Sequence, residues 1–88
     1  MTTPFLAIEL EAIYEMNGHI EVVRDHGLPI SGYALYLRAC NARGDALAEW
    51  LCDHPERDWL HSVGNLLATC YAIPLHDYTP HGLAQSSR

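Results

Sequence analysis

The chain contains no lysine, and its only strongly basic residues are five arginines among 88 residues. Eleven acidic residues outnumber them and give a formal net charge of −6. Affinity for duplex nucleic acid grows with the number of phosphates that basic side chains neutralise. Five scattered arginines are too few for such a surface, so we expect no direct nucleic-acid binding. The acidity favours solubility, or attraction to a protein partner with a basic surface.

Long apolar runs and an even set of cysteines are also missing. No stretch approaches the roughly 18 apolar residues that a membrane-spanning helix needs, and the mean hydropathy is −0.07. The first residues lack the basic and apolar regions of a secretory signal. Three cysteines argue against a disulfide framework and for a reducing compartment. We therefore expect one small cytoplasmic domain without a membrane segment.

Two N-terminal segments have the pattern of a β-hairpin. Every even position from Leu6 to Met16 is apolar, and glutamates occupy several odd positions. This alternation predicts a strand over 5–16 with one buried face, with a helix as the alternative. Asn17-Gly18 follows, which is a strong hairpin signal, and it predicts a returning strand over 19–25.

Two registers are possible for this hairpin. A two-residue turn would pair Tyr14 with Glu21, which mixes acidic and apolar side chains on one face. A three-residue loop with a G1 bulge would pair Tyr14 with Ile20 and is preferred, because the apolar sets then coincide. In that register one outer face collects five acidic residues and two partly exposed apolar ones. They are Glu9, Glu11, Glu15, Glu21, Asp25, Ile13 and Val23.

The middle of the chain is harder to assign. Residues 31–40 fit both a strand and a helix, and their tyrosines favour the strand. Residues 46–53 are expected to form a first helix, because Leu47 and Trp50 have helical spacing and Pro55 provides a stop.

The most regular pattern covers residues 56–72, which are expected to form an amphipathic helix that ends before Pro74. Trp50 and Trp59 lie on the apolar faces of the two expected helices, so both are predicted to be in the core.

Together these elements predict an α+β fold. A three-stranded antiparallel sheet would be covered on one face by two C-terminal helices. Residues 1–74 would form the single domain, and residues 75–88 an irregular, partly disordered tail. A core of this size buries only about 60% of the unfolded surface, so dimerisation could support it.

No catalytic or metal-binding motif is present. The spacings of zinc fingers, of metalloprotease helices and of nucleophile elbows are all missing, so we expect neither an enzyme nor a cofactor. Six histidines nevertheless leave a metal-binding module as a further hypothesis. Its candidate ligands are His76, Asp77 and His81, with Cys52 or His54 as a further ligand.

The acidic face of the hairpin is the strongest functional feature. Charged outer faces usually guard a sheet edge against aggregation. Here Glu9 would oppose Asp25, which is unfavourable unless a cation compensates, and Ile13 and Val23 would resemble an interface core with a charged rim. We therefore expect a docking surface for a basic protein. The alternative is a homodimeric cytoplasmic regulator that uses Ile13, Val23 and Tyr36.

One stretch resembles a known family. Leu47-Ala-Glu-Trp50-Leu-Cys-Asp-His-Pro55 is similar to the helix-Pro-helix half of small phage-encoded anti-CRISPR proteins that act on type I-F systems. The shared features are the Leu47–Trp50 spacing, Pro55 five residues later, and strands followed by two helices. This resemblance implies a stoichiometric inhibitor that binds a CRISPR surveillance complex and blocks target DNA. It transfers no binding residue, because the matched positions are core positions.

Overall fold

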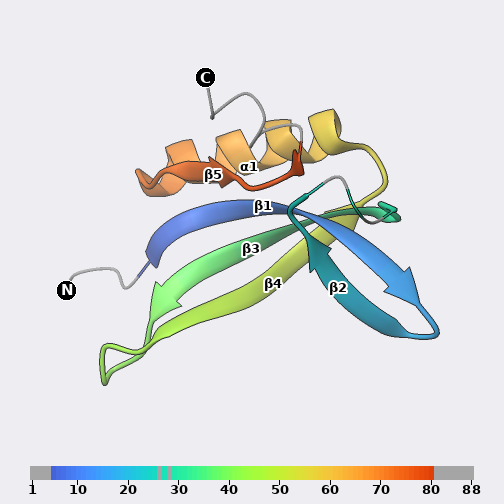
Figure 1. Cartoon of the computed structure of the whole chain (residues 1–88). Coiled ribbons are helices and arrows are strands. Elements are labelled where there is room, and N and C mark those ends of the chain that lie inside the picture. The colour runs from blue at the N-terminus through green and yellow to red at the C-terminus, as the bar shows by residue number, and fades with distance from the viewer. Residues whose placement is uncertain (1–4, 26, 28, 81–88) are drawn as a thin grey trace.

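The computed structural model describes residues 5–25, 27 and 29–80, and across these residues it shows one curved sheet and one helix (Figure 1). The elements in chain order are β1 (Phe5–Met16), β2 (His19–Val23), β3 (Gly32–Cys40), β4 (Ala46–His54), α1 (Arg57–Tyr71) and β5 (Leu75–Asp77). The main strand order is β2-β1-β3-β4, and all of these neighbours are antiparallel. The short β5 pairs in parallel with β1.

The core lies between the sheet and α1. Ile8 and Leu10 of β1, Leu35 of β3, and Leu60 and Ala68 of α1 form its buried cluster. These residues come from alternate positions of the strands and from one stripe of the helix, as expected for a sheet face covered by an amphipathic helix.

The expectation of three strands and two helices is wrong, because residues 46–54 form β4 rather than a helix. β4 pairs with β3 along most of its length, so the backbone N–H and C=O groups of residues 46–54 have partners in the sheet. A short isolated helix over the same residues would be only marginally stable. The side chain of Asn41 accepts hydrogen bonds from the backbone N–H groups of Arg43 and Asp45, which builds the turn between the two strands.

Other elements agree more closely with the sequence pattern. Residues 5–16 and 32–40 are strands, and residues 57–71 are the amphipathic helix. Among the described residues, no helix is long and apolar enough to cross a bilayer. The expectation of an irregular segment from residue 75 fails for residues 75–77, which form β5; residues 81–88 lie outside the described part of the chain.

The preferred hairpin register is also wrong. β1 and β2 are joined by a two-residue turn, with Tyr14 opposite Glu21 and Ala12 opposite Val23. Asn17 and Gly18 both have positive φ, at 54° and 78°, as a type I′ turn requires. Such a turn matches the right-handed twist of the two strands, and this local preference outweighs the alignment of apolar residues.

Gly18→Ala is expected to lower the free energy of unfolding by about 1 kcal/mol, because a side chain at positive φ is strained. A Cβ at this position would meet nothing within 4 Å, so a loss of stability would come from backbone strain and not from a steric clash. Urea denaturation measures the effect, with Asn17→Gly as a control that tolerates the same backbone. Equal stability of Gly18→Ala and the wild type would contradict the assigned turn.

Candidate binding groove on the concave face of the sheet

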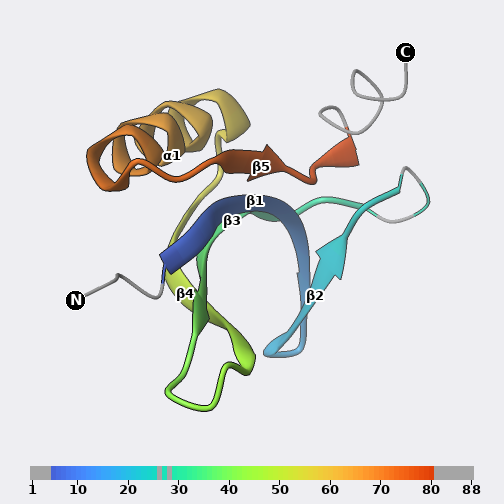
Figure 2. The same ribbon diagram turned by 90° about the vertical axis from the view of Figure 1, so that its left-hand side faces the viewer.

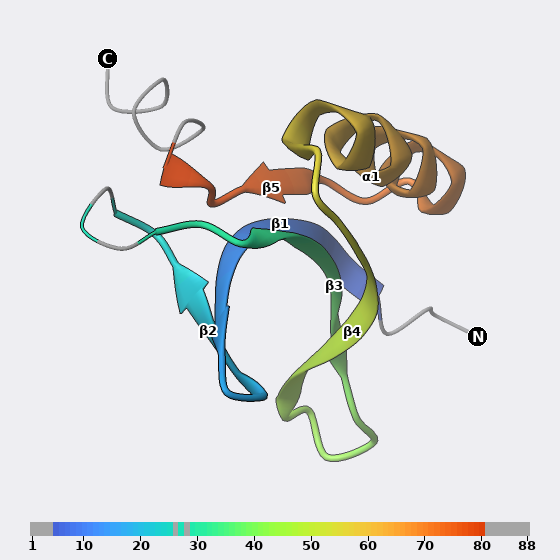
Figure 3. The same cartoon turned by 90° about the vertical axis from the view of Figure 1, so that its right-hand side faces the viewer.

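The sheet is bent into an arch, and its concave face is open. Figures 2 and 3 show α1 and β5 on the convex side, while the β1–β2 and β3–β4 hairpins curve away from them on either side of the opening. Since Ile8 and Leu10 face α1, the alternate residues Glu9 and Glu11 point to the concave side. Cross-strand partners share a face, which places Tyr36, opposite Glu9, there as well.

Two arginine–glutamate pairs lie on this concave face. Arg38 donates from Nε and Nη2 to Glu9 at 3.2 and 2.9 Å, and Arg24 donates from the same two groups to Glu11 at 3.2 and 2.5 Å. The Glu9 and Glu11 side chains are only 8% and 4% exposed. Burial of a charged carboxylate is unfavourable unless the carboxylate is paired in this bidentate way. The two arginines therefore stabilise the sheet by neutralising the buried glutamates.

Both guanidinium groups stay charged in these pairs. The hydrogen bond to Glu11 raises the pKa of Arg24, against a smaller effect of burial, and the hydrogen bond to Glu9 raises the pKa of Arg38. The Arg24 guanidinium also lies over the ring of Tyr78, 4.3 Å from its centroid. This cation–π contact ties the end of β2 to the chain that follows β5.

A groove of about 340 Å³ runs over these pairs. It is lined by Glu9, Glu11, Val22, Arg24, Tyr36, Arg38 and Ala48. Burial raises the pKa of Tyr36, and the nearby carboxylates of Glu11 and Asp53 raise it further. The Tyr36 side chain therefore keeps its hydroxyl proton at neutral pH and can act as a hydrogen-bond donor.

Large apolar side chains stand exposed on the same concave face. Trp50 lies opposite Tyr36 and is 59% exposed, Val22 lies opposite Ile13 and is 45% exposed, and Ile20 is 50% exposed. The expectation that Trp50 is in the core is therefore wrong, because it depended on a helix at residues 46–53. Sequence reasoning missed Trp50 as a surface residue for this reason.

Trp59 was also expected in the core and is instead 51% exposed. Its ring stacks on His54, with 4.2 Å between centroids and an interplanar angle of 21°. The Nδ1 of His54 accepts a hydrogen bond from the backbone N–H of Glu56. Trp59 therefore covers the connection between β4 and α1 rather than the hydrophobic cluster.

The residues of the predicted acidic face are not brought together as a single exposed surface. Glu9 and Glu11 are buried and paired with arginine, and Ile13 and Val23 are 6% and 1% exposed. The homodimer hypothesis thereby loses two of its three contact residues.

The other three predicted residues, Glu15, Glu21 and Asp25, are exposed. In the observed register Glu21 pairs with Tyr14, so it points to the opposite face from Glu15. Asp25 lies beyond the end of β2, where its side chain accepts a hydrogen bond from the backbone N–H of Gly27. It therefore does not oppose Glu9.

The pairing of charges leaves the surface strongly acidic. All eleven acidic residues lie in the described part of the chain, and four of them form ion pairs with arginine: Glu9, Glu11, Asp58 and Asp77. The remaining seven have no arginine partner there, and all are exposed: Glu15, Glu21, Asp25, Asp45, Glu49, Asp53 and Glu56. Three of the five arginines are thus used inside the molecule, and the uncompensated charge is at the surface.

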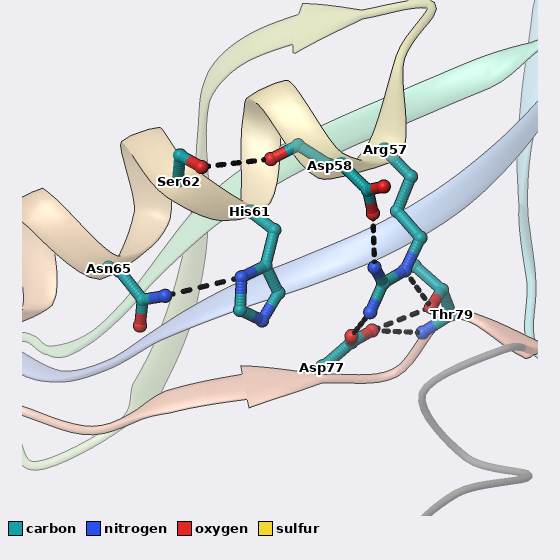
Figure 4. A network of polar contacts seen from close by, with 7 residues as sticks. All are labelled: Arg57, Asp58, His61, Ser62, Asn65, Asp77 and Thr79. Atoms are coloured by element: carbon teal, nitrogen blue, oxygen red, sulfur yellow. Dashed lines mark hydrogen bonds and ion pairs between the residues drawn. The ribbon is translucent and has the colours of Figure 1, made fainter.

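A second polar network holds β5 against the start of α1 (Figure 4). Arg57 donates to Asp77, to Asp58 at 2.8 Å and to the Thr79 hydroxyl at 3.1 Å. Asp77 also accepts hydrogen bonds from the backbone N–H and the hydroxyl of Thr79. Every group in this cluster is engaged with another, so it works as a clamp between the two elements.

The predicted metal ligands are not gathered into a site. Asp77 is committed to the Arg57 clamp, His54 to the stack with Trp59, and His76 to a contact with Tyr78. Burial raises the pKa of the Cys52 thiol, and neighbouring Asp53 adds to this effect. No group of three potential ligands occurs within residues 5–25, 27 and 29–80, and His81 lies outside them.

Comparison with known proteins gave no matching family model, no matching curated protein and no matching solved structure. The functional interpretation therefore depends on the geometry of the groove. The stretch from Leu47 to Pro55, which carries the resemblance to anti-CRISPR proteins, forms β4 and the residue after it. The helix-Pro-helix arrangement of that resemblance does not occur in these residues.

Proposed function

We propose that this protein is a small acidic, non-enzymatic binding module whose concave sheet face holds a basic segment of a partner protein. The observation that carries the proposal is a groove with internally neutralised charges, flanked by exposed Trp50, Val22 and Ile20. Exposed apolar side chains around a hollow face are typical of interaction sites.

The composition of the face supports protein binding. Tryptophan, tyrosine and arginine are the residues most enriched among those that dominate binding energy. Trp50, Tyr36 and Arg24 provide all three types around one groove. The glutamates of the floor already accept two hydrogen bonds each from arginine, which favours recognition over catalysis.

The charge of the partner follows from the uncompensated carboxylates. Glu15 and Asp53 lie on the concave side at one end of the sheet and border a hollow of about 160 Å³, together with Ile13 and Tyr33. Neither carboxylate has a cationic partner among the described residues. A lysine or arginine side chain would fit between them, and the net charge of −6 would steer a basic segment to the site.

The sequence resemblance of residues 47–55, which form β4 and not a helix, implies one concrete candidate partner, a type I-F CRISPR surveillance complex with a basic surface. It stays a prediction alongside the more general proposal. A CRISPR complex is one partner to test, alongside partners captured from a bacterial lysate and purified.

Trp50→Ala is expected to weaken the complex about 30-fold, because a tryptophan at the centre of an interface contributes about 2 kcal/mol or more. Glu15→Arg with Asp53→Arg is expected to weaken it further and to remove its salt dependence. Isothermal titration calorimetry with the purified partner at two salt concentrations measures both effects. Each substituted residue is exposed, so folding is preserved.

Matched controls separate the concave face from the rest of the surface. Leu66→Ala on the outer side of α1 removes an apolar side chain that is 65% exposed, and Glu21→Arg reverses a charge on the opposite face of the hairpin. Both should bind within about twofold of the wild type. Unchanged affinity in the Trp50 and Glu15/Asp53 variants would overturn the proposal.

A further inference from the structure

The two arginines of the groove have unused hydrogen-bond donors. Arg24 and Arg38 each contact their glutamate through Nε and Nη2, and the Nη1 group of neither contacts any described residue. The hydroxyl of Tyr36 also has no partner there. Arg24 is exposed, and no buried polar atom of Arg38 or Tyr36 is left unsatisfied, so these donors are open to solvent. The groove is therefore lined by donors that are free to bind an acceptor of a partner.

An anion is a poor acceptor for this groove. Each guanidinium is already neutralised by a glutamate at hydrogen-bond distance. The carboxylates of Glu15 and Asp53, which have no arginine partner, lie on the same concave face, and the whole chain carries −6. A phosphate or carboxylate would be repelled, whereas a neutral carbonyl oxygen would meet only the donors.

We propose that Arg24, Arg38 and Tyr36 donate hydrogen bonds to main-chain carbonyl groups of the bound partner segment. This inference rests on the proposed function, and it divides recognition between two sets of residues. The carboxylates of Glu15 and Asp53 select basic side chains, and the donors of the groove floor hold the backbone whatever its side chains are. Val22 of β2 and Trp50 of β4 lie on the two sides of the arch, so the backbone of the partner segment would pass between them.

Two properties of the floor suit this task. The Arg–Glu pairs fix the planes of the guanidinium groups, so little side-chain freedom is lost when a carbonyl binds. Tyr36 keeps its proton at neutral pH, because burial and the nearby carboxylates raise its pKa, and it therefore donates rather than accepts. The floor thus offers preorganised donors along an open groove.

The test uses the ¹⁵N-labelled full chain and three probes. The first is a blocked hexapeptide of alternating arginine and alanine, and the second is spermidine, which has the same positive charge but no carbonyl group. The third is sodium acetate, an anion. Nuclear magnetic resonance titrations follow the Nε–H signals of Arg24 and Arg38 and the backbone signals of Glu15 and Asp53. Tyr36→Phe removes one donor, and Tyr71→Phe at the end of α1, outside both the groove and the Glu15/Asp53 hollow, is its matched control.

We expect both cations to shift the signals of Glu15 and Asp53, and only the peptide to shift those of Arg24 and Arg38. Tyr36→Phe should weaken peptide binding about fivefold, as the loss of one neutral hydrogen bond does, and leave spermidine binding unchanged. Tyr71→Phe should change neither peptide binding nor spermidine binding.

The inference would be overturned if the peptide did not change the chemical shifts of Arg24 and Arg38, or if acetate changed them and the peptide did not. Either result would leave the proposed function in place. Equal peptide binding by Tyr36→Phe and the wild type would likewise overturn the inference alone. Failure of both cations to shift the signals of Glu15 and Asp53 would remove the proposed function and this inference with it.

Discussion

Glu11→Arg is expected to abolish the folded state. The side chain of Glu11 is only 4% exposed and accepts two hydrogen bonds from Arg24. Loss of one partner of a buried ion pair costs about 3–5 kcal/mol. The substitution also buries a second guanidinium group against the first, so the total loss should exceed about 5 kcal/mol, which is comparable to the whole stability of a small domain.

Glu15→Arg is the matched comparison, because it makes the same change four residues later in the same strand. Glu15 is exposed and has no arginine partner, so its free energy of unfolding should change by less than about 0.5 kcal/mol. Circular dichroism and the dispersion of amide signals distinguish the two variants. A Glu11→Arg protein with a cooperative unfolding transition near that of the wild type would contradict the role assigned to the ion pair.

This comparison also decides how the acidic residues can be used in binding experiments. Charge reversal at Glu11 and Glu15 together would remove the fold along with any binding surface. Only exposed carboxylates such as Glu15 and Asp53 report on a partner.

Leu60→Ala is expected to lower the free energy of unfolding by about 3 kcal/mol. Leu60 is fully buried and packs with Ile8, Leu10 and Leu35, where α1 crosses the sheet. Truncation leaves a cavity that close-packed neighbours fill only in part. The midpoint of urea denaturation should fall while the slope of the transition stays constant.

Leu66→Ala provides the control on the same helix, since the helix propensity changes equally at both sites. Leu66 is 65% exposed, so its truncation should cost less than about 0.5 kcal/mol. Similar losses at Leu60 and Leu66 would contradict the side of α1 that is assigned to the core.

The wrong assignment of residues 46–54 has a specific physical cause. Trp50 pairs with Tyr36 and Cys52 pairs with Leu35, so Leu51 is an extra residue between them. A β-bulge of this kind interrupts the alternation of faces along a strand. Leu47, Trp50 and Leu51 have the spacing of a helix face in the sequence. Because of the bulge, β4 lacks the regular alternation by which a strand is recognised.

The wrong prediction of the hairpin register has another physical cause. The bulged register is favoured only if one face of β1 is buried and the acidic residues of the other face point to solvent. Both faces of Ala7–Ile13 are buried in the structure, because Arg24 and Arg38 cover the glutamates. A register that places acidic and apolar residues on the same face is then not unfavourable. The register is set instead by the two-residue turn that Asn17-Gly18 favours.

The sequence by itself determined the strand β1, the amphipathic helix α1 and the acidic character of the surface, because these depend on local periodicity and on composition. Only the tertiary structure decided which carboxylates are available to a partner. Glu11 meets Arg24 from 13 residues away, and Glu9 meets Arg38 from 29 residues away. Such pairings depend on strand order and register, which are set by long-range packing and leave no pattern along the chain.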